Sequence, residues 1–341
     1  MNQVKIAMIG FGGIARAHYS GYQAMLKSHP YLSLVAVCDI VPEQMTRQIK
    51  INTSTEPVTL SADIHTYSSV DELLANEEFD MADICLPTYL HKEYTVKMLR
   101  AGKHVLCEKP MALCSADCEE MIATANECGK KLMIAQCLRF DSPYLHLKNA
   151  VESGEYGKLK TLTMSRLSAL PIWGFEQWFR DTNRSGGCIL DMHIHDVDMA
   201  RFLLGEPEAV STVAYDGETR WQWENTRLFY KDTIVSINGS WDETRGTPFV
   251  GDFRAVFENA TILRAPDGHA VLYKENEAPV DLPDISGDCY AEEIAFFAKT
   301  IAEELPNTVN SPESACTTVK LIEALRESAD RGGEKIPFSF Q

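Results

Sequence analysis

The first 137 residues alternate short apolar runs with stretches of helical periodicity. The runs are continuous, as is typical of strands buried on both faces of a parallel sheet. They cover residues 4–9, 34–38, 81–86, 105–107 and 132–135. Between them apolar residues recur at helical spacing, for example from Ile14 to Leu26. Strands that alternate with helices predict an α/β domain with a doubly wound parallel sheet.

The pattern changes after about residue 140, where apolar and polar residues alternate one by one. Such alternation predicts half-buried antiparallel strands. It covers residues 159–164, 227–230, 233–237 and 253–257, and helical periodicity returns near 290–303 and 312–331. The sequence therefore predicts a Rossmann dinucleotide-binding domain over residues 1–137. An α+β domain with an open, mainly antiparallel sheet is expected over residues 138–341.

A glycine turn follows the first predicted strand and reads Gly10-Phe11-Gly12-Gly13-Ile14-Ala15. Gly10 permits the tight turn, Gly12 lets the backbone approach a pyrophosphate, and the small Ala15 permits close packing of helix on strand. The exposed N-terminus of the helix attracts the phosphates. Strand, turn and helix together indicate dinucleotide binding rather than a purely structural turn.

Asp39 ends the second predicted strand and bears on the choice of cofactor. An acid at this place accepts hydrogen bonds from both hydroxyls of the adenosine ribose and repels a 2′-phosphate. The next residues, Ile40 and Val41, offer no cation to offset that repulsion. NAD is therefore expected in preference to NADP. The nearby Arg16 and Arg47 are expected to contact the pyrophosphate side or solvent.

Further candidate chemistry follows the next two strands. Ligands bind where the parallel strands of an α/β sheet end. We therefore expect His91, Glu108 and Lys109 at the mouth of the site, with Pro87 at the end of its strand. The alternative is that Lys109 is a solvated loop lysine and the following proline a simple strand stop.

A second polar constellation follows the pair Gly186-Gly187. One continuous helix would place Asp191, His195 and Asp198 on one face, with the residues between them pointing elsewhere. An imidazole titrates near neutral pH and a carboxylate can orient it, so this face suits proton transfer to a bound ligand. A capped helix with solvated acids is the simpler alternative.

The ten cysteines are scattered and form no Cys-x-x-Cys pair. Three of them lie within predicted strands: Cys38, Cys85 and Cys107. Buried free thiols are therefore expected, and no metal. A zinc site is the alternative, and its ligands would be Cys188, His193 and His195, completed by Asp191 or Asp198.

These motifs, taken in order, resemble those of the Gfo/Idh/MocA oxidoreductases. This family contains sugar and polyol dehydrogenases related to glucose–fructose oxidoreductase and inositol dehydrogenase. The resemblance rests on the glycine turn, on Pro87-Thr88-Tyr89-Leu90-His91, on Glu108-Lys109-Pro110, and on Gly186-Gly187 through Asp198. It runs over nearly the whole chain. Two positions depart from the family pattern: His193, where many members carry glycine, and Thr88, where asparagine is frequent.

The resemblance implies a catalytic Lys109 with Asp191 and His195 as the substrate-side pair. It also implies cofactor contacts at Gly10, Gly12, Gly13, Ile14, Ala15, Asp39, Pro87, His91, Glu108 and Lys109. Candidate substrate contacts are Trp173, Trp178 and Asp198. Aromatic rings can stack on the C–H face of a sugar, although such rings more often fill a core or an interface.

The expected reaction is reversible hydride transfer between NAD and a carbinol carbon of a sugar, polyol or inositol-like substrate. The fold also hosts NAD-dependent glycosidases that oxidise a sugar transiently, and non-catalytic regulators that bind a dinucleotide. Retention of both Lys109 and His195 argues against a regulator. The lack of an export signal argues mildly against a secreted glycosidase.

The composition of the chain limits the kinds of binding partner that are expected. The net charge of -17 over 341 residues leaves no basic stripe for nucleic acid and disfavours an anionic membrane surface. No apolar run reaches the ~18 residues that span a bilayer, so a cytoplasmic enzyme is expected. The open sheet is expected to expose an apolar face. A homodimer or homotetramer that covers this face is therefore predicted.

Overall fold

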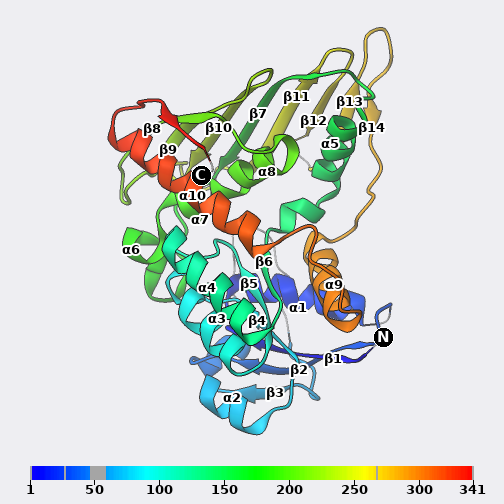
Figure 1. The fold of residues 1–341 in the computed structure, drawn as a ribbon, viewed down its shortest axis with the longest axis vertical. Coiled ribbons are helices and arrows are strands. Elements are labelled where there is room, and N and C mark those ends of the chain that lie inside the picture. The colour runs from blue at the N-terminus through cyan, green and yellow to red at the C-terminus, as the bar shows by residue number, and fades with distance from the viewer. Residues whose placement is uncertain (1, 27, 47–58, 266–267, 340–341) are drawn as a thin grey trace. The chain divides into compact units, whose positions relative to one another are not determined.

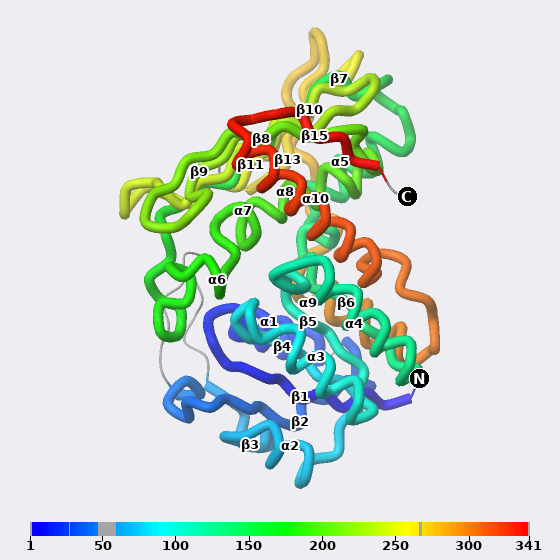
Figure 2. The backbone as a smooth tube through the Cα atoms, turned by 60° about the vertical axis from the view of Figure 1, so that its left-hand side comes forward, coloured from blue at the N-terminus to red at the C-terminus, as the bar shows by residue number. Residues whose placement is uncertain are grey.

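The computed structural model describes residues 2–26, 28–46, 59–265 and 268–339, which form two compact units. Figures 1 and 2 show the course of the chain. The first unit comprises Met1–Cys137, Ile172–Trp178 and Asp288–Cys316, and the second comprises Leu138–Pro171, Phe179–Gly287 and Thr317–Gln341. One border falls after residue 137, and two later segments return to the first unit. Helix α9 (Cys289–Ala302) belongs to this return because it packs against α1 (Gly13–Met25).

The first unit is built on a six-stranded parallel sheet in the order β3-β2-β1-β4-β5-β6. Its strands are β1 (Val4–Ile9), β2 (Leu32–Cys38), β3 (His65–Tyr67), β4 (Met81–Ile84), β5 (His104–Glu108) and β6 (Leu132–Ala135). Besides α1 and α9 its helices are α2 (Val70–Asn76), α3 (His91–Arg100) and α4 (Ser115–Cys128). The pairs α1–α9 and α3–α4 lie on opposite sides of the sheet (Figure 1). The predicted doubly wound sheet is confirmed.

Strand register brings the ends of four strands to one edge of this sheet. Ile9 at the end of β1 pairs with Cys38 of β2 and Ile84 of β4, and Ile84 pairs with Cys107 of β5. The residues that follow these strands therefore lie along one edge. The strand order reverses between β1 and β4, and ligands of doubly wound sheets bind at such a switch point.

The second unit contains a nine-stranded sheet in the order β14-β13-β12-β11-β7-β10-β9-β8-β15. Its strands are β7 (Leu159–Leu167), β8 (Ala209–Tyr215), β9 (Trp223–Phe229), β10 (Ile234–Ser240), β11 (Val250–Phe257), β12 (Thr261–Arg264), β13 (Ala270–Tyr273), β14 (Val280–Asp281) and β15 (Ile336–Pro337). Every neighbouring pair is antiparallel except β7 with β10. The predicted open, mainly antiparallel sheet is confirmed.

Helices cover one face of this sheet (Figure 1). They are α5 (Ser142–Ser153), α7 (Cys188–Asp191), α8 (Ile194–Leu204) and α10 (Pro312–Asp330), while the short helix α6 (Thr182–Ser185) precedes α7. Apolar residues of the strands pack against these helices. Leu162, Met164 and Ile237, for example, are fully buried.

The uncovered face of the sheet differs in part from the apolar surface that the sequence suggested. Its partly exposed central positions are polar, with Thr163 and Ser165 on β7 and Ser236 and Asn238 on β10. Asn238 accepts a hydrogen bond of 2.8 Å from the amide of Asn225. Apolar side chains are exposed on the same face, with Ile234 of β10 61% exposed and Val213 of β8, which pairs with Asn225, 56% exposed. The open face is therefore mixed, with a polar centre and apolar residues around it.

In the described part of the chain, no helix combines the length and the apolar character needed to cross a bilayer.

Candidate active site

The glycine turn forms the centre of the cofactor edge in the first unit. Gly10 has a φ of +88°, and a Cβ there would lie 2.6 Å from the carbonyl oxygen of Cys85. Gly12 caps the N-terminus of α1, and a Cβ on it would meet no atom within 4 Å. The helix then begins with Gly13, Ile14 and the fully buried Ala15. The first turn of α1 therefore faces open space, where its N–H groups can receive a phosphate.

Asp39 lies beside this turn and is joined to it. Its Oδ2 accepts the N–H of Phe11 at 2.7 Å and its Oδ1 accepts the N–H of Val41 at 2.8 Å. Burial raises the pKa of Asp39, and these two bonds oppose the rise. Each oxygen keeps acceptor capacity, so the carboxylate can still receive ribose hydroxyls.

Arg16 and Arg47 were expected to contact the pyrophosphate side or solvent. Arg16 is 1% exposed and donates to the carbonyl of Gln44 at 2.7 Å, so the solvent contact expected for it is wrong. Its guanidinium also lies 5.3 Å from the ring centre of Phe11. Arg47 lies outside the described residues.

Lys109 extends the same edge directly after β5 and is half-buried. Its backbone N–H donates to Oε2 of Glu108 at 2.9 Å. The fully buried His91 ties this loop to the preceding one, because Nδ1 lies 2.7 Å from the Pro110 oxygen and Nε2 2.8 Å from the Leu86 oxygen. Pro87 precedes a turn of 3-10 helix that leads to His91. The predicted residues after β4 and β5 are thus brought together, with His91 as the connection between the two loops.

A buried cluster around His18 was missed by the sequence reasoning. Nδ1 of His18 lies 3.0 Å from Asp83, and Nε2 lies 3.0 Å from Glu108 and 3.9 Å from Glu293. Burial lowers the pKa of His18, but the charge of Asp83 and the hydrogen bonds outweigh it and raise the pKa well above its ordinary value. The cluster therefore holds Glu108 between an imidazolium and the backbone of Lys109. The available signal was Asp83, a charged residue inside an apolar strand.

The second unit carries Asp191 and His195 on two short helices rather than one. Helix α7 ends at Asp191 and α8 begins at Ile194. The N–H of His193 bonds to the carbonyl of Cys188 at 3.0 Å, which closes a wider turn than the α-helical one. The prediction of one continuous helix is wrong, because this wider turn shifts the faces of the two helices relative to each other.

Exposure nevertheless separates the predicted catalytic pair from its neighbours. Asp191 and His195 are half-exposed, whereas every other residue from Met192 to Ala200 is buried. Asp198 is 2% exposed, and its two oxygens accept from Arg139 at 2.7 and 2.8 Å. This ion pair gives Asp198 a structural role. Asp191 and His195 are the groups of this segment that a substrate can reach.

The glycines before α7 are required by its geometry. Gly187 has a φ of +77°, and a Cβ on it would lie 2.6 Å from the carbonyl oxygen of Arg220. Gly186, at φ +79°, would overlap the side chain of Leu190. No other residue fits this turn without a shift of the neighbouring chain.

The aromatic and metal candidates are placed as follows. Trp178 is 8% exposed, which favours the core interpretation for this residue, while Trp173 is half-exposed.

All ten cysteines are free thiols, and the three expected in strands are buried. Among the described residues, the groups of ligand atoms close enough to share an ion all include His18. The zinc site considered from Cys188, His193 and His195 is therefore not formed.

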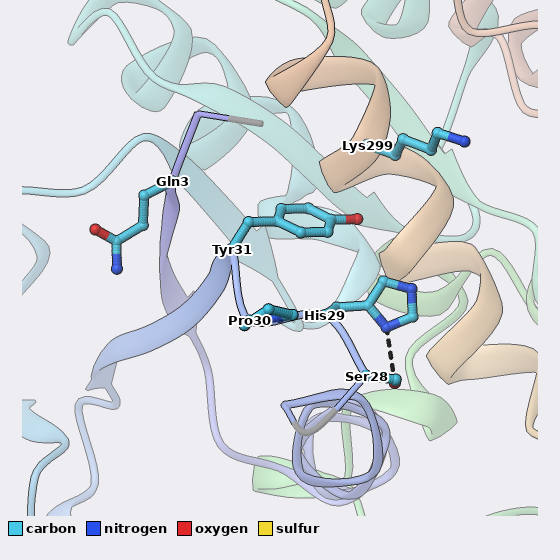
Figure 3. A pocket seen from close by; sticks show the side chains of 6 residues that line it. All are labelled: Gln3, Ser28, His29, Pro30, Tyr31 and Lys299. Atoms are coloured by element: carbon cyan, nitrogen blue, oxygen red, sulfur yellow. Dashed lines mark hydrogen bonds between the residues drawn. The ribbon is translucent and has the colours of Figure 1, made fainter.

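A separate hollow lies at the other end of the first unit's sheet (Figure 3). Gln3, Tyr31 and Lys299 line it together with the segment 28–30, where Ser28 bonds to His29 at 2.9 Å. Gln3 precedes β1, residues 28–31 precede β2 and Lys299 lies on α9, so the hollow is at the opposite end of the strands from Lys109.

Comparison with known proteins agrees with this geometry. Residues 4–136 match the model of the oxidoreductase family with an NAD-binding Rossmann fold, and residues 144–262 match the C-terminal domain of the same family. The chain belongs to the Gfo/Idh/MocA oxidoreductase family. Residues 4–136, within the first unit, form its NAD-binding Rossmann fold, as the sequence motifs predicted.

Two relatives in this family and one solved structure illustrate its range. The chain is 30% identical to myo-inositol 2-dehydrogenase of Thermotoga maritima, over 91% of this chain and 89% of that protein. It is 31% identical to 2,7-anhydro-N-acetylneuraminate hydratase of Mediterraneibacter gnavus, over 84% of this chain and 70% of that protein. A structure of levoglucosan dehydrogenase with NADH and levoglucosan has the same fold, with a TM-score of 0.82, 19% identity, and coverage of 99% of this chain and 100% of that one.

Proposed function

We propose that this Gfo/Idh/MocA protein oxidises a carbinol of a sugar, polyol or inositol-like substrate with NAD as the hydride acceptor. The observation that carries the proposal is the half-buried Lys109 at the carboxyl edge of the NAD-binding sheet, in a chain similar over nine-tenths of its length to an inositol dehydrogenase. Bound NAD supplies an electrophilic ring that accepts a hydride. The protein must supply the proton transfer.

Lys109 and His195 manage the hydroxyl proton in this proposal. The substrate carbon loses a hydride to the nicotinamide and its hydroxyl loses a proton to the lysine or the imidazole, so a carbonyl forms. Asp191 orients His195 or binds a neighbouring hydroxyl. An imidazole that is positioned in this way is suited to proton transfer near neutral pH.

The carboxylate of Asp39, directly after β2, supports a preference for NAD over NADP. Its carboxylate is fixed beside the phosphate-binding turn, and the next side chain, Ile40, is 66% exposed and uncharged. A 2′-phosphate would be repelled by this carboxylate.

We also infer a cytoplasmic homo-oligomer. A dissociable dinucleotide is a cofactor of the cell interior, and the sheet of the second unit leaves one face uncovered.

A second reaction is suggested by the relative named as a hydratase. Transient oxidation could serve hydration or glycoside cleavage without net cofactor reduction. The test is a panel of inositols, sugars and their glycosides incubated with NAD, in which NADH absorbance and cleavage products are both followed. Reduction without cleavage supports the dehydrogenase, cleavage without net reduction supports the second reaction, and neither result supports a non-catalytic regulator.

A further inference from the structure

Two buried polar side chains of the second unit face each other beneath α7 and α8. His193 lies in the turn between these helices, and Glu224 lies on β9; neither is exposed to solvent. Nδ1 of His193 and Oε1 of Glu224 are 3.7 Å apart. Strand register places Glu224 opposite Gly239 of β10. A Cβ at Gly239 would lie 2.8 Å from Nδ1 and overlap the carboxyl group, so the glycine makes room for the pair.

The hydrogen bonds around the pair leave Nδ1 of His193 and the carboxyl group of Glu224 to share a proton. Nε2 of His193 lies 2.8 Å from Oγ1 of Thr226, which lies 3.0 Å from Oγ1 of Thr212. Apart from the weak thiol donor of Cys188, neither Nδ1 nor the carboxyl oxygens of Glu224 have a partner among the described residues. A buried polar group without a partner costs free energy. The 3.7 Å between Nδ1 and Oε1 is slightly longer than a hydrogen bond, and a proton on Glu224 would let the carboxyl close this gap and donate to Nδ1.

The surrounding charges agree with that assignment. Burial raises the pKa of Glu224 to about 8. Burial and the charge of Arg166 lower the pKa of His193 to about 3. Arg166 itself is held by Asp196 through bonds of 3.0 and 2.9 Å, and the remaining ionisable group beside the carboxyl is the Cys188 thiol, whose pKa burial raises. At neutral pH the carboxyl therefore keeps its proton and the imidazole is neutral.

We propose that Glu224 donates a proton to Nδ1 of His193, and that this bond positions the turn that carries Asp191 and His195. This role rests on the proposed function of those two residues. Helix α7 has only four residues, so its own hydrogen bonds hold it weakly. His193 lies two residues from each member of the pair and ties their turn to the sheet. Glu224 and His193 are thus positioning residues and do not themselves touch the substrate.

The proton can be tested without any measurement of activity. The infrared carbonyl band of a protonated carboxylic acid should be present in the wild-type protein at pH 7 and lost in Glu224→Gln. Nitrogen NMR of His193 should show a neutral ring with the proton on Nε2. A missing acid band, or a proton on Nδ1, would overturn the proposal.

The positioning role is tested by two substitutions at one place. Glu224→Gln keeps an N–H donor for Nδ1 and should retain the wild-type kcat, whereas Glu224→Leu removes the donor and should lower kcat by about 10- to 100-fold with unchanged NADH affinity. Leu228→Ala on the same strand is the control for lost stability and should lower the melting temperature without this loss of kcat. Equal kcat in the Gln and Leu variants would overturn the role.

The NMR signal of His195 separates this proposal from the proposed function. It should shift in Glu224→Leu and stay in place in Glu224→Gln. If the wild-type protein reduces NAD with no substrate of the panel, the proposed function fails, while the acid band and the His195 signal still decide the proton and the positioning. An unmoved His195 signal in the Leu variant would contradict positioning whatever the substrate.

Discussion

In the first unit, two acids connect the backbone to the functional side chains. Glu108 receives the imidazole of His18 on one oxygen and the N–H of Lys109 on the other. Asp39 joins the phosphate-binding turn to the end of β2. In each case the acid fixes the main chain next to a functional side chain, so its loss affects geometry as well as charge.

Replacement of Asp39 tests the choice of cofactor. The wild-type protein should bind NADH more tightly than NADPH, because the carboxylate repels a 2′-phosphate. Asp39→Ala should narrow that difference, mainly through tighter binding of NADPH. Fluorescence titration with both cofactors measures it, and Asp63→Ala, at an exposed acid elsewhere in the unit, is the control. Stronger binding of NADPH by the wild-type protein would refute the assignment.

The raised pKa of Glu224 leads to a prediction about how the stability of the protein depends on pH. Its folded pKa of about 8 exceeds the ordinary 4.5, so between these values the folded protein keeps a proton that the unfolded chain loses. Stability contributed by this group should therefore fall as pH rises through that window, by at most ~1.4 kcal/mol per pH unit. His193, with a pKa lowered to about 3, stays neutral in the folded protein while the unfolded imidazole titrates around 6.5, and this contribution is common to the wild-type protein and Glu224→Gln.

Urea unfolding at pH 6.5 and pH 8 isolates this contribution. The free energy of unfolding of the wild-type protein should decrease relative to that of Glu224→Gln across this interval, since the amide does not titrate. A constant difference between the two proteins would show that Glu224 is ionised in the folded state.

At the scale of elements, the turn before α7 decides where the proposed catalytic pair lies. Gly187→Ala should destabilise the protein by a few kcal/mol, from a backbone conformation open only to glycine and from the contact with the Arg220 oxygen. Gly205→Ala is the matched control, because Gly205 has a similar φ of +76° and open space around it. Thermal unfolding should show a greater loss for Gly187→Ala, and equal losses would remove the role assigned to this contact.

Elements were predictable where a local pattern determines them. The strand, glycine turn and helix at the N-terminus could be read from spacing alone, and so could the alternating strands of the second unit. The break between α7 and α8 could not, because one wider hydrogen-bonded turn leaves the side-chain pattern unchanged. The cluster around His18 was missed because its acids come from β4, β5 and α9, which only the fold brings together.

At the scale of the molecule, the two units have different sheets and different tasks. The first presents strand ends to a dinucleotide. The second buries apolar residues under helices, and its other face mixes a polar centre with exposed apolar residues such as Val213 and Ile234. The open face has cross-strand amide pairs such as Asn225 with Asn238. An interface on this face would therefore combine hydrogen bonds and trapped water with apolar contact.

Light scattering tests association through this face. The wild-type protein should be a dimer or tetramer at micromolar concentration. Ser236→Glu should shift it towards monomer, because it places charges near the middle of the face, whereas Ser153→Glu at the exposed end of α5 should have no effect. A wild-type monomer would contradict the predicted oligomer.

The central claim is that Lys109 and His195 transfer the substrate proton in an NAD-dependent oxidation. The most direct measurement is kcat, together with NADH affinity, for Lys109→Met and His195→Ala on the best substrate of the panel. Each should lose ~10²–10⁴-fold in kcat while NADH affinity changes only a few-fold. Lys97→Met and His65→Ala, at surface ion pairs, should match the wild-type protein. Wild-type kcat in either Lys109→Met or His195→Ala would contradict the account.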